Sequence, residues 1–120
     1  MLASFGRLFC YIFIYMEVHQ IQDHIEDKYG ITLDLYDRRD HIILSRIMVE
    51  NNERGLGKGT KALKELHDYA DEMNLPVFLT PANSMGTFNK LVRWYKKHGY
   101  KKNTDKSKNR EFLVRYPDSI

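Results

Sequence analysis

A glycine-rich segment near the middle of the chain has the composition of a phosphate-binding loop. It reads Arg54-Gly55-Leu56-Gly57-Lys58-Gly59-Thr60. Glycine lets a backbone approach a ligand closely, and the unpaired amides and positive dipole at a helix start attract anions. Arg54 and Lys58 add full positive charges. The segment therefore predicts a site for a phosphate or pyrophosphate group.

Spacing excludes two common nucleotide-binding loops. A P-loop needs a glycine, four residues, and then Gly-Lys followed by Ser or Thr, but Lys58 is followed by Gly59. The dinucleotide fingerprint needs a glycine three residues after Gly57, and Thr60 occupies that position. The loop must therefore belong to another class of site.

Two motifs in order along the chain match a third pattern. Arg54, Gly57 and Gly59 fit the form Arg/Gln-x-x-Gly-x-Gly/Ala. About 40 residues later, the run from Tyr95 to Tyr100 fits Tyr-x-Lys-x-Gly-Phe/Tyr. The glycine loop alone is also compatible with a simple turn, and its pairing with the second motif is what makes the pattern specific.

With these two motifs, residues 31–116 resemble the GNAT acetyltransferase superfamily. The resemblance implies an α/β fold (α+β, mixed sheet) of the GNAT-like type, in which a central mixed β-sheet is flanked by helices. It implies acetyl-CoA as co-substrate, without a metal. The implied reaction is transfer of an acetyl group to a primary amine by direct attack on the thioester.

The resemblance also assigns roles to residues. The backbone of Ile47, Met48 and Val49 is expected to pair with the pantetheine arm, and one amide there to polarise the thioester oxygen. The loop is expected to wrap the pyrophosphate of acetyl-CoA through Arg54, Gly55, Leu56, Gly57, Lys58, Gly59 and Thr60. Tyr95 matches the tyrosine that faces the departing sulfur, although it also shares a helical face with core-like residues.

The acceptor amine and its base are not assigned by these motifs. Glu50 and Glu53 are the acidic residues nearest the loop, but they read equally well as solvated carboxylates. The part of the domain before the loop is shorter than in many GNAT members, and Phe88 and Leu91 stand where relatives carry Asn and Ala. The alternative function is therefore a non-catalytic acyl-CoA-binding or protein-interaction module on the same scaffold.

The elements before the loop follow from periodicity. Residues 17–29 place Val18, Ile21, Ile25 and Tyr29 at helical spacing, and Gly30 closes the run. Residues 31–36 alternate apolar and polar side chains, and the polar residues 37–40 separate them from residues 41–49. These patterns predict a helix followed by a β-hairpin.

The elements after the loop complete a βαβ unit. Residues 60–73 predict a helix whose apolar face is Ala62, Leu63, Leu66, Ala70 and Met73. Residues 77–79 predict a buried strand parallel to the one ending at Val49. A further helix follows from Phe88 to about Gly99, then a strand from Tyr100 and a last strand at residues 112–116.

Composition fits one domain with an anionic ligand. The chain has 120 residues and a formal charge of +3, which favours anions without resembling a histone-like surface. Cys10 is the single cysteine, so a reducing, cytoplasmic location is expected and a metal site is not. The histidines, including His24, His67 and His98, are expected on polar faces.

The sequence also leads to expectations about the partners of the chain. An amine-bearing acceptor, either a small molecule or a protein amine, and a homodimer are expected, with no membrane. The basic connection 101–110 is read as a solvated loop, with contact to an anionic ligand as the alternative. Nucleic acid is disfavoured, because aromatic and basic residues are not interleaved there.

The first 16 residues are treated apart from a single domain over residues 17–120. Residues 8–16 are continuously apolar, but they are fewer than the roughly 20 that span a bilayer, and no signal-peptidase pattern follows. The segment is read as a buried first strand. The alternative is a true start at Met16.

Overall fold

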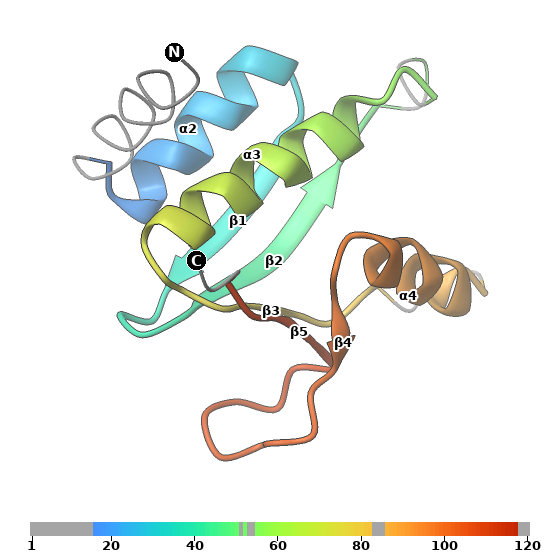
Figure 1. Ribbon diagram of the computed structural model, residues 1–120. Coiled ribbons are helices and arrows are strands. Elements are labelled where there is room, and N and C mark those ends of the chain that lie inside the picture. The colour runs from blue at the N-terminus through green and yellow to red at the C-terminus, as the bar shows by residue number, and fades with distance from the viewer. Residues whose placement is uncertain (1–15, 51, 53–54, 83–85, 118–120) are drawn as a thin grey trace, which may run out of the picture.

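The chain forms an α+β domain with one five-stranded mixed sheet (Figure 1). The computed structural model describes residues 16–50, 52, 55–82 and 86–117. Within them the strand order is β1-β2-β3-β5-β4. The elements are α2 (Val18–Tyr29), β1 (Thr32–Asp37), β2 (Ile42–Met48), α3 (Lys58–Glu72), β3 (Val77–Leu79), α4 (Phe88–Lys97), β4 (Lys101–Lys102) and β5 (Leu113–Arg115). The predicted mixed sheet with flanking helices is confirmed at this level.

Helix α2 and the β1–β2 hairpin have the predicted form. Val18, Ile21 and Ile25 are buried on one side of α2, and Gly30 ends the helix in the left-handed conformation at φ 63°. Its amide donates to the Glu26 carbonyl at 2.8 Å. Glycine suits this position because other residues are strained at positive φ. Strands β1 and β2 pair antiparallel, as predicted.

Helix α3 starts at Lys58, two residues before the predicted start at Thr60. Ala62, Leu63, Leu66 and Ala70 are buried as predicted, and Met73 lies just past the helix end, half-buried. The expectation that His67 lies on a polar face is wrong, since it is 6% exposed. This side chain is buried because its Nε2 hydrogen-bonds the Tyr100 hydroxyl at 2.9 Å, which supplies a polar partner inside the core.

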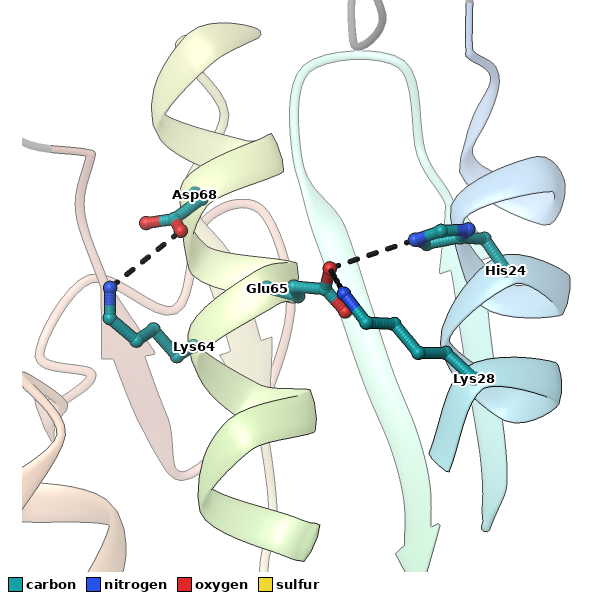
Figure 2. A network of polar contacts seen from close by, with 5 residues as sticks. All are labelled: His24, Lys28, Lys64, Glu65 and Asp68. Carbon is teal, nitrogen blue, oxygen red and sulfur yellow. Dashed lines mark hydrogen bonds and ion pairs between the residues drawn. The ribbon is translucent and has the colours of Figure 1, made fainter. Parts of the chain in front are cut away.

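Helices α2 and α3 lie side by side over the hairpin (Figure 1). Figure 2 shows the polar contacts between them: Lys28 of α2 reaches Glu65 of α3 at 2.8 Å, and His24 lies 3.6 Å from the same carboxylate. The hydrogen bond that Lys28 donates to Glu65 raises the pKa of Lys28. His24 is largely exposed, as expected. The pairing fixes the two helices beside each other.

Strands β2 and β3 are parallel, as the βαβ pattern predicts, but they pair over a short stretch. The register joins Ile42–Leu44 to Val77–Leu79. Two residues beyond Leu79 stands Pro81, which has no amide proton to continue the ladder. Strand β2 therefore continues to Met48 after its pairing with β3 has ended.

The C-terminal elements are shorter than predicted. Tyr100 precedes β4 instead of beginning it, and β5 covers Leu113–Arg115 instead of residues 112–116. At the end of β5, Arg115 forms a bidentate pair with Asp71 of α3 at 2.8 and 3.0 Å. Gly99 has φ 93°, a conformation that favours glycine, and it lies next to the Arg115 side chain. This pair attaches the last strand to α3.

One apolar core joins α2, α3, α4 and the sheet within the described residues. Of the predicted first strand, residues 8–16, only Met16 lies within the described ranges, and it belongs to no strand. Met16 is half-buried, and its carbonyl accepts a hydrogen bond from the Tyr69 hydroxyl at 2.9 Å. In the described ranges, no helix combines the length and the apolar character that crossing a bilayer requires.

Candidate functional site

A small cavity lies where β2 and β3 separate. Its volume is about 110 Å³, and its wall includes Leu44 and Ile47 from β2, Leu79 from β3, and Leu91 and Tyr95 from α4. At roughly 30 Å³ per water, this is room for three or four water-sized groups. The cavity therefore suits a small reacting group and not a whole large ligand.

A β-bulge lies in the cavity wall. In the hairpin register, Asp34 faces Arg46 and Leu35 faces Leu44, so Ser45 is an extra residue without a partner on β1. Ser45 also lines the cavity. Bulges bend a strand, leave backbone groups outside the ladder and recur next to active sites. The bulged residue of β2 thus lies in the wall of the cavity between β2 and β3.

Tyr95 of α4 lines this cavity. It is 6% exposed, and its ring packs edge-on against Trp94 and Tyr100, with centroids 4.9 and 5.5 Å apart. Burial raises the pKa of Tyr95 to about 12. Among the described residues the hydroxyl has no hydrogen-bond partner. Tyr95 is thus both a core residue and a neutral donor at a cavity wall.

The glycine loop leads into the first turn of α3. Gly55 and Gly57 have φ of 87° and 78°, which favours glycine, and Gly57 is the residue before the helix. Gly55, Leu56, Gly57 and Thr60 are exposed, with Leu56 at 65%. Lys58 opens the helix, where the dipole is positive. Arg54 lies outside the described residues.

Strand β2 lines the cavity and leads towards the glycine loop. A Cβ built on Gly59 would lie 3.7 Å from Val49 and 3.9 Å from the Trp94 ring. The end of β2, the start of α3 and the middle of α4 therefore converge. Of the three strand residues expected to contact the pantetheine arm, Ile47 lines the cavity, Met48 is exposed and Val49 is half-buried.

The candidate bases from the sequence do not reach this cavity within the described residues. Glu50 is exposed and absent from the cavity wall, and Glu53 lies outside the described ranges. The wall instead includes Arg46 and Thr80, which sequence reasoning missed. The bulge at Ser45 is what a simple hairpin register cannot predict, since it shifts the partners of β1 by one residue.

A buried polar cluster, formed by His67, Tyr100 and Arg115, lies next to Tyr95. The pKa of His67 falls to about 3, first because it is buried and then because Arg115 and His98 are nearby. Burial raises the pKa of Tyr100 well above its usual value. Both groups are therefore neutral at pH 7. This cluster supports the wall that carries Tyr95, since the Tyr95 and Tyr100 rings are in contact.

Comparisons with known proteins add no assignment. No model of a known protein family matches the sequence, and no curated protein matches it either. Within the described part of the chain, His, Cys, Asp and Glu side chains form no group of three or more that would hold a metal ion.

Proposed function

We propose that this chain is an acetyl-CoA-dependent N-acetyltransferase of the GNAT type that acetylates a primary amine. The observation that carries the proposal is one continuous path. A strand separates from its parallel neighbour at a cavity holding Tyr95, and the same strand leads into a glycine loop at the start of a helix. We assign the thioester to the cavity and the pyrophosphate to the loop.

The loop suits the anionic end of the cofactor. Its exposed glycine backbone and the positive end of α3 attract phosphate oxygens, and Lys58 adds a charge. The pantetheine arm would then run along β2 past Val49 and Ile47, where β3 no longer occupies the edge. An extended arm there replaces a missing strand.

The reaction in this site is direct. The neutral amine attacks the thioester carbon, a C–N bond forms and the C–S bond breaks. The attacking nitrogen loses one proton, and the leaving thiolate takes up one proton to give CoA. A lysine-like ammonium must first lose its proton, at a cost of about 4.6 kcal/mol at pH 7. In this proposal a backbone amide at the Ser45 bulge, which lines the cavity, polarises the thioester oxygen.

Tyr95 acts on the leaving group as a hydrogen-bond donor. Its pKa of about 12 exceeds that of a cysteine-like thiol, near 8.5, by roughly 3.5 units, so full proton transfer would be uphill by about 5 kcal/mol. A neutral phenol in a small cavity stabilises a developing thiolate without giving up its proton.

Binding of acetyl-CoA tests the proposal. Gly57 and Gly30 both have positive φ and open space around an added Cβ, so a side chain strains each similarly. Calorimetry is expected to show that the wild type and Gly30→Asp bind acetyl-CoA, whereas Gly57→Asp loses at least tenfold in affinity. Equal affinity in the two variants would remove the loop from the site, and no binding by the wild type would end the proposal.

A non-catalytic acyl-CoA-binding module is the second candidate. It is favoured by the cavity wall, which contains no Asp or Glu side chain among the described residues. This reading predicts acetyl-CoA binding without CoA release on any amine, and no effect of Tyr95→Phe beyond stability. CoA release on a single amine, lost in the Tyr95→Phe variant, would exclude it.

A further inference from the structure

Among the described residues that line the cavity, Arg46 is the charged one. Its Nε donates to Asp34 across the hairpin at 2.9 Å, and the two side chains are 57% and 38% exposed. A guanidinium has five N–H donors, so this bond leaves the terminal N–H groups for another anion. Asp34 thus holds the guanidinium through Nε, and no described residue is bound to its two terminal nitrogens.

A hydroxyl and a carboxylate meet just outside the β3–β5 pair, since Thr80 follows β3 and Glu111 precedes β5. Thr80, which also lines the cavity, donates to Glu111 at 2.5 Å and accepts from the Phe112 amide at 3.0 Å. A threonine hydroxyl has one donor and two acceptor positions, so one acceptor position remains. A protonated or neutral amine can donate to it, with the Glu111 carboxylate as the compensating charge.

Arg46 and Thr80 are exposed polar residues that line the cavity at the place where β2 and β3 separate, and we call this place the entrance. Leu44 and Leu79, the last paired residues of β2 and β3, are buried, whereas Arg46 and Thr80, just beyond them, are exposed. The cavity, about 110 Å³, has room for the reacting groups and not for a large acceptor. The rest of the acceptor must therefore lie at this entrance, between a guanidinium and a hydroxyl–carboxylate pair.

We infer that the acceptor is an amine with an anionic group close to it, as in an α-amino acid, whose carboxylate binds Arg46 while its amine lies over Thr80 and Glu111. The inference rests on the proposed acetyl transfer and adds the substrate class. The guanidinium at the entrance repels acceptors that are cationic throughout, such as polyamines.

Three matched amines test this inference. Alanine, alaninamide and ethylamine present a similar small amine, and only alanine carries a carboxylate. With the full chain at saturating acetyl-CoA, CoA release is expected to show kcat/KM for alanine at least tenfold above that for the other two. A preference for ethylamine or alaninamide, or no preference, would overturn the inference.

Substitutions separate recognition from structure. Arg46→Gln is expected to raise KM for alanine about tenfold, with kcat and the rate on alaninamide unchanged. Arg93→Gln removes the same charge from an exposed position on α4 outside the cavity wall and is expected to leave all three rates unchanged. An equal loss on alanine and alaninamide in Arg46→Gln would show a structural role and overturn the inference.

Acetyl-CoA binding, measured separately by calorimetry, distinguishes the two levels of failure. If the chain binds acetyl-CoA and acetylates the amines without preferring alanine, the inference fails and the proposed function stands. If acetyl-CoA does not bind, the proposed function fails and the inference falls with it. If acetyl-CoA binds and neither these amines nor a wider amine panel releases CoA, the non-catalytic reading holds and the inference is again overturned.

Discussion

The Glu26 carboxylate on α2 accepts a hydrogen bond from the backbone amide of Leu33 on β1, at 2.9 Å. One helical turn earlier, Gln22 accepts from the amide of Leu35 at 2.8 Å. Among the strands that the structure describes, β1 is an edge of the sheet, with β2 as its neighbour. Two side chains spaced by four residues therefore occupy the acceptor positions that a neighbouring strand would fill.

Opening this edge is expected to cause self-association. In Gln22→Ala/Glu26→Ala, two amides lose their acceptors, which costs about 2–4 kcal/mol of unfolding free energy. Light scattering after size exclusion is expected to show larger species. Asp23→Ala/Asp27→Ala alters the exposed face of the same helix and is the control. Equal behaviour of the two double variants would contradict a role in covering the edge.

Tyr95→Phe is expected to lower kcat while the acetyl-CoA affinity stays near that of the wild type. The lost hydrogen bond to a developing thiolate corresponds to about 1.5–3 kcal/mol, or roughly 10- to 100-fold in rate. Because the pKa of Tyr95 is about 12, this step adds no pH dependence below pH 10. Steady-state kinetics and thermal unfolding on both proteins check this. An unchanged kcat would assign Tyr95 to the core alone.

His67 is expected to make the fold sensitive to acid. Its pKa is about 3 in the folded chain and near 6.5 when unfolded, so the unfolded state binds the extra proton between these values. Its stability contribution is complete above pH 6.5 and is lost as the pH falls towards 3, by up to about 1.4 kcal/mol per pH unit.

His67→Gln removes this dependence. The variant is expected to be less stable than the wild type at pH 7, and the difference is expected to shrink as the pH falls to 4.5. Urea unfolding at several pH values measures it. His19→Gln, at an exposed position, should keep the wild-type slope. A constant difference between His67→Gln and the wild type across this range would contradict the prediction.

The Arg115–Asp71 pair is expected to show strong coupling. Asp71→Ala leaves a largely buried guanidinium without its bidentate partner and is expected to cost about 3–5 kcal/mol of unfolding free energy. Asp71→Leu/Arg115→Met removes both charges and is expected to be more stable than Asp71→Ala. A double-mutant cycle with additive free energies would contradict the coupling.

Local patterns predicted the elements well because they depend on neighbouring residues. Helix α2, the hairpin and the parallel pairing of β2 with β3 follow from periodicity and from the glycine and proline positions. Burial of His67 did not follow, because its partner, Tyr100, is 33 residues away. A polar side chain on a helix reads as solvated until its distant partner is known.

The candidate site also has a part that the sequence predicted and a part that it did not. Its loop and Tyr95 were predicted from motifs within single elements. Thr80 and Glu111, 31 residues apart, meet through the pairing of β3 with β5, and no local pattern links them. The groups at the entrance therefore required the tertiary structure, and they are the ones that bear on the acceptor.

The bulge at Ser45 has a consequence for how this site can change. On both sides of the bulge, core residues of β1 still face core residues of β2, since Leu33 pairs with Ile47 and Leu35 with Leu44. Deleting Ser45 would straighten the strand without moving any side chain to the other face of the hairpin. A single-codon deletion or insertion can therefore remove or create the bent wall of the cavity while the core pattern is inherited intact.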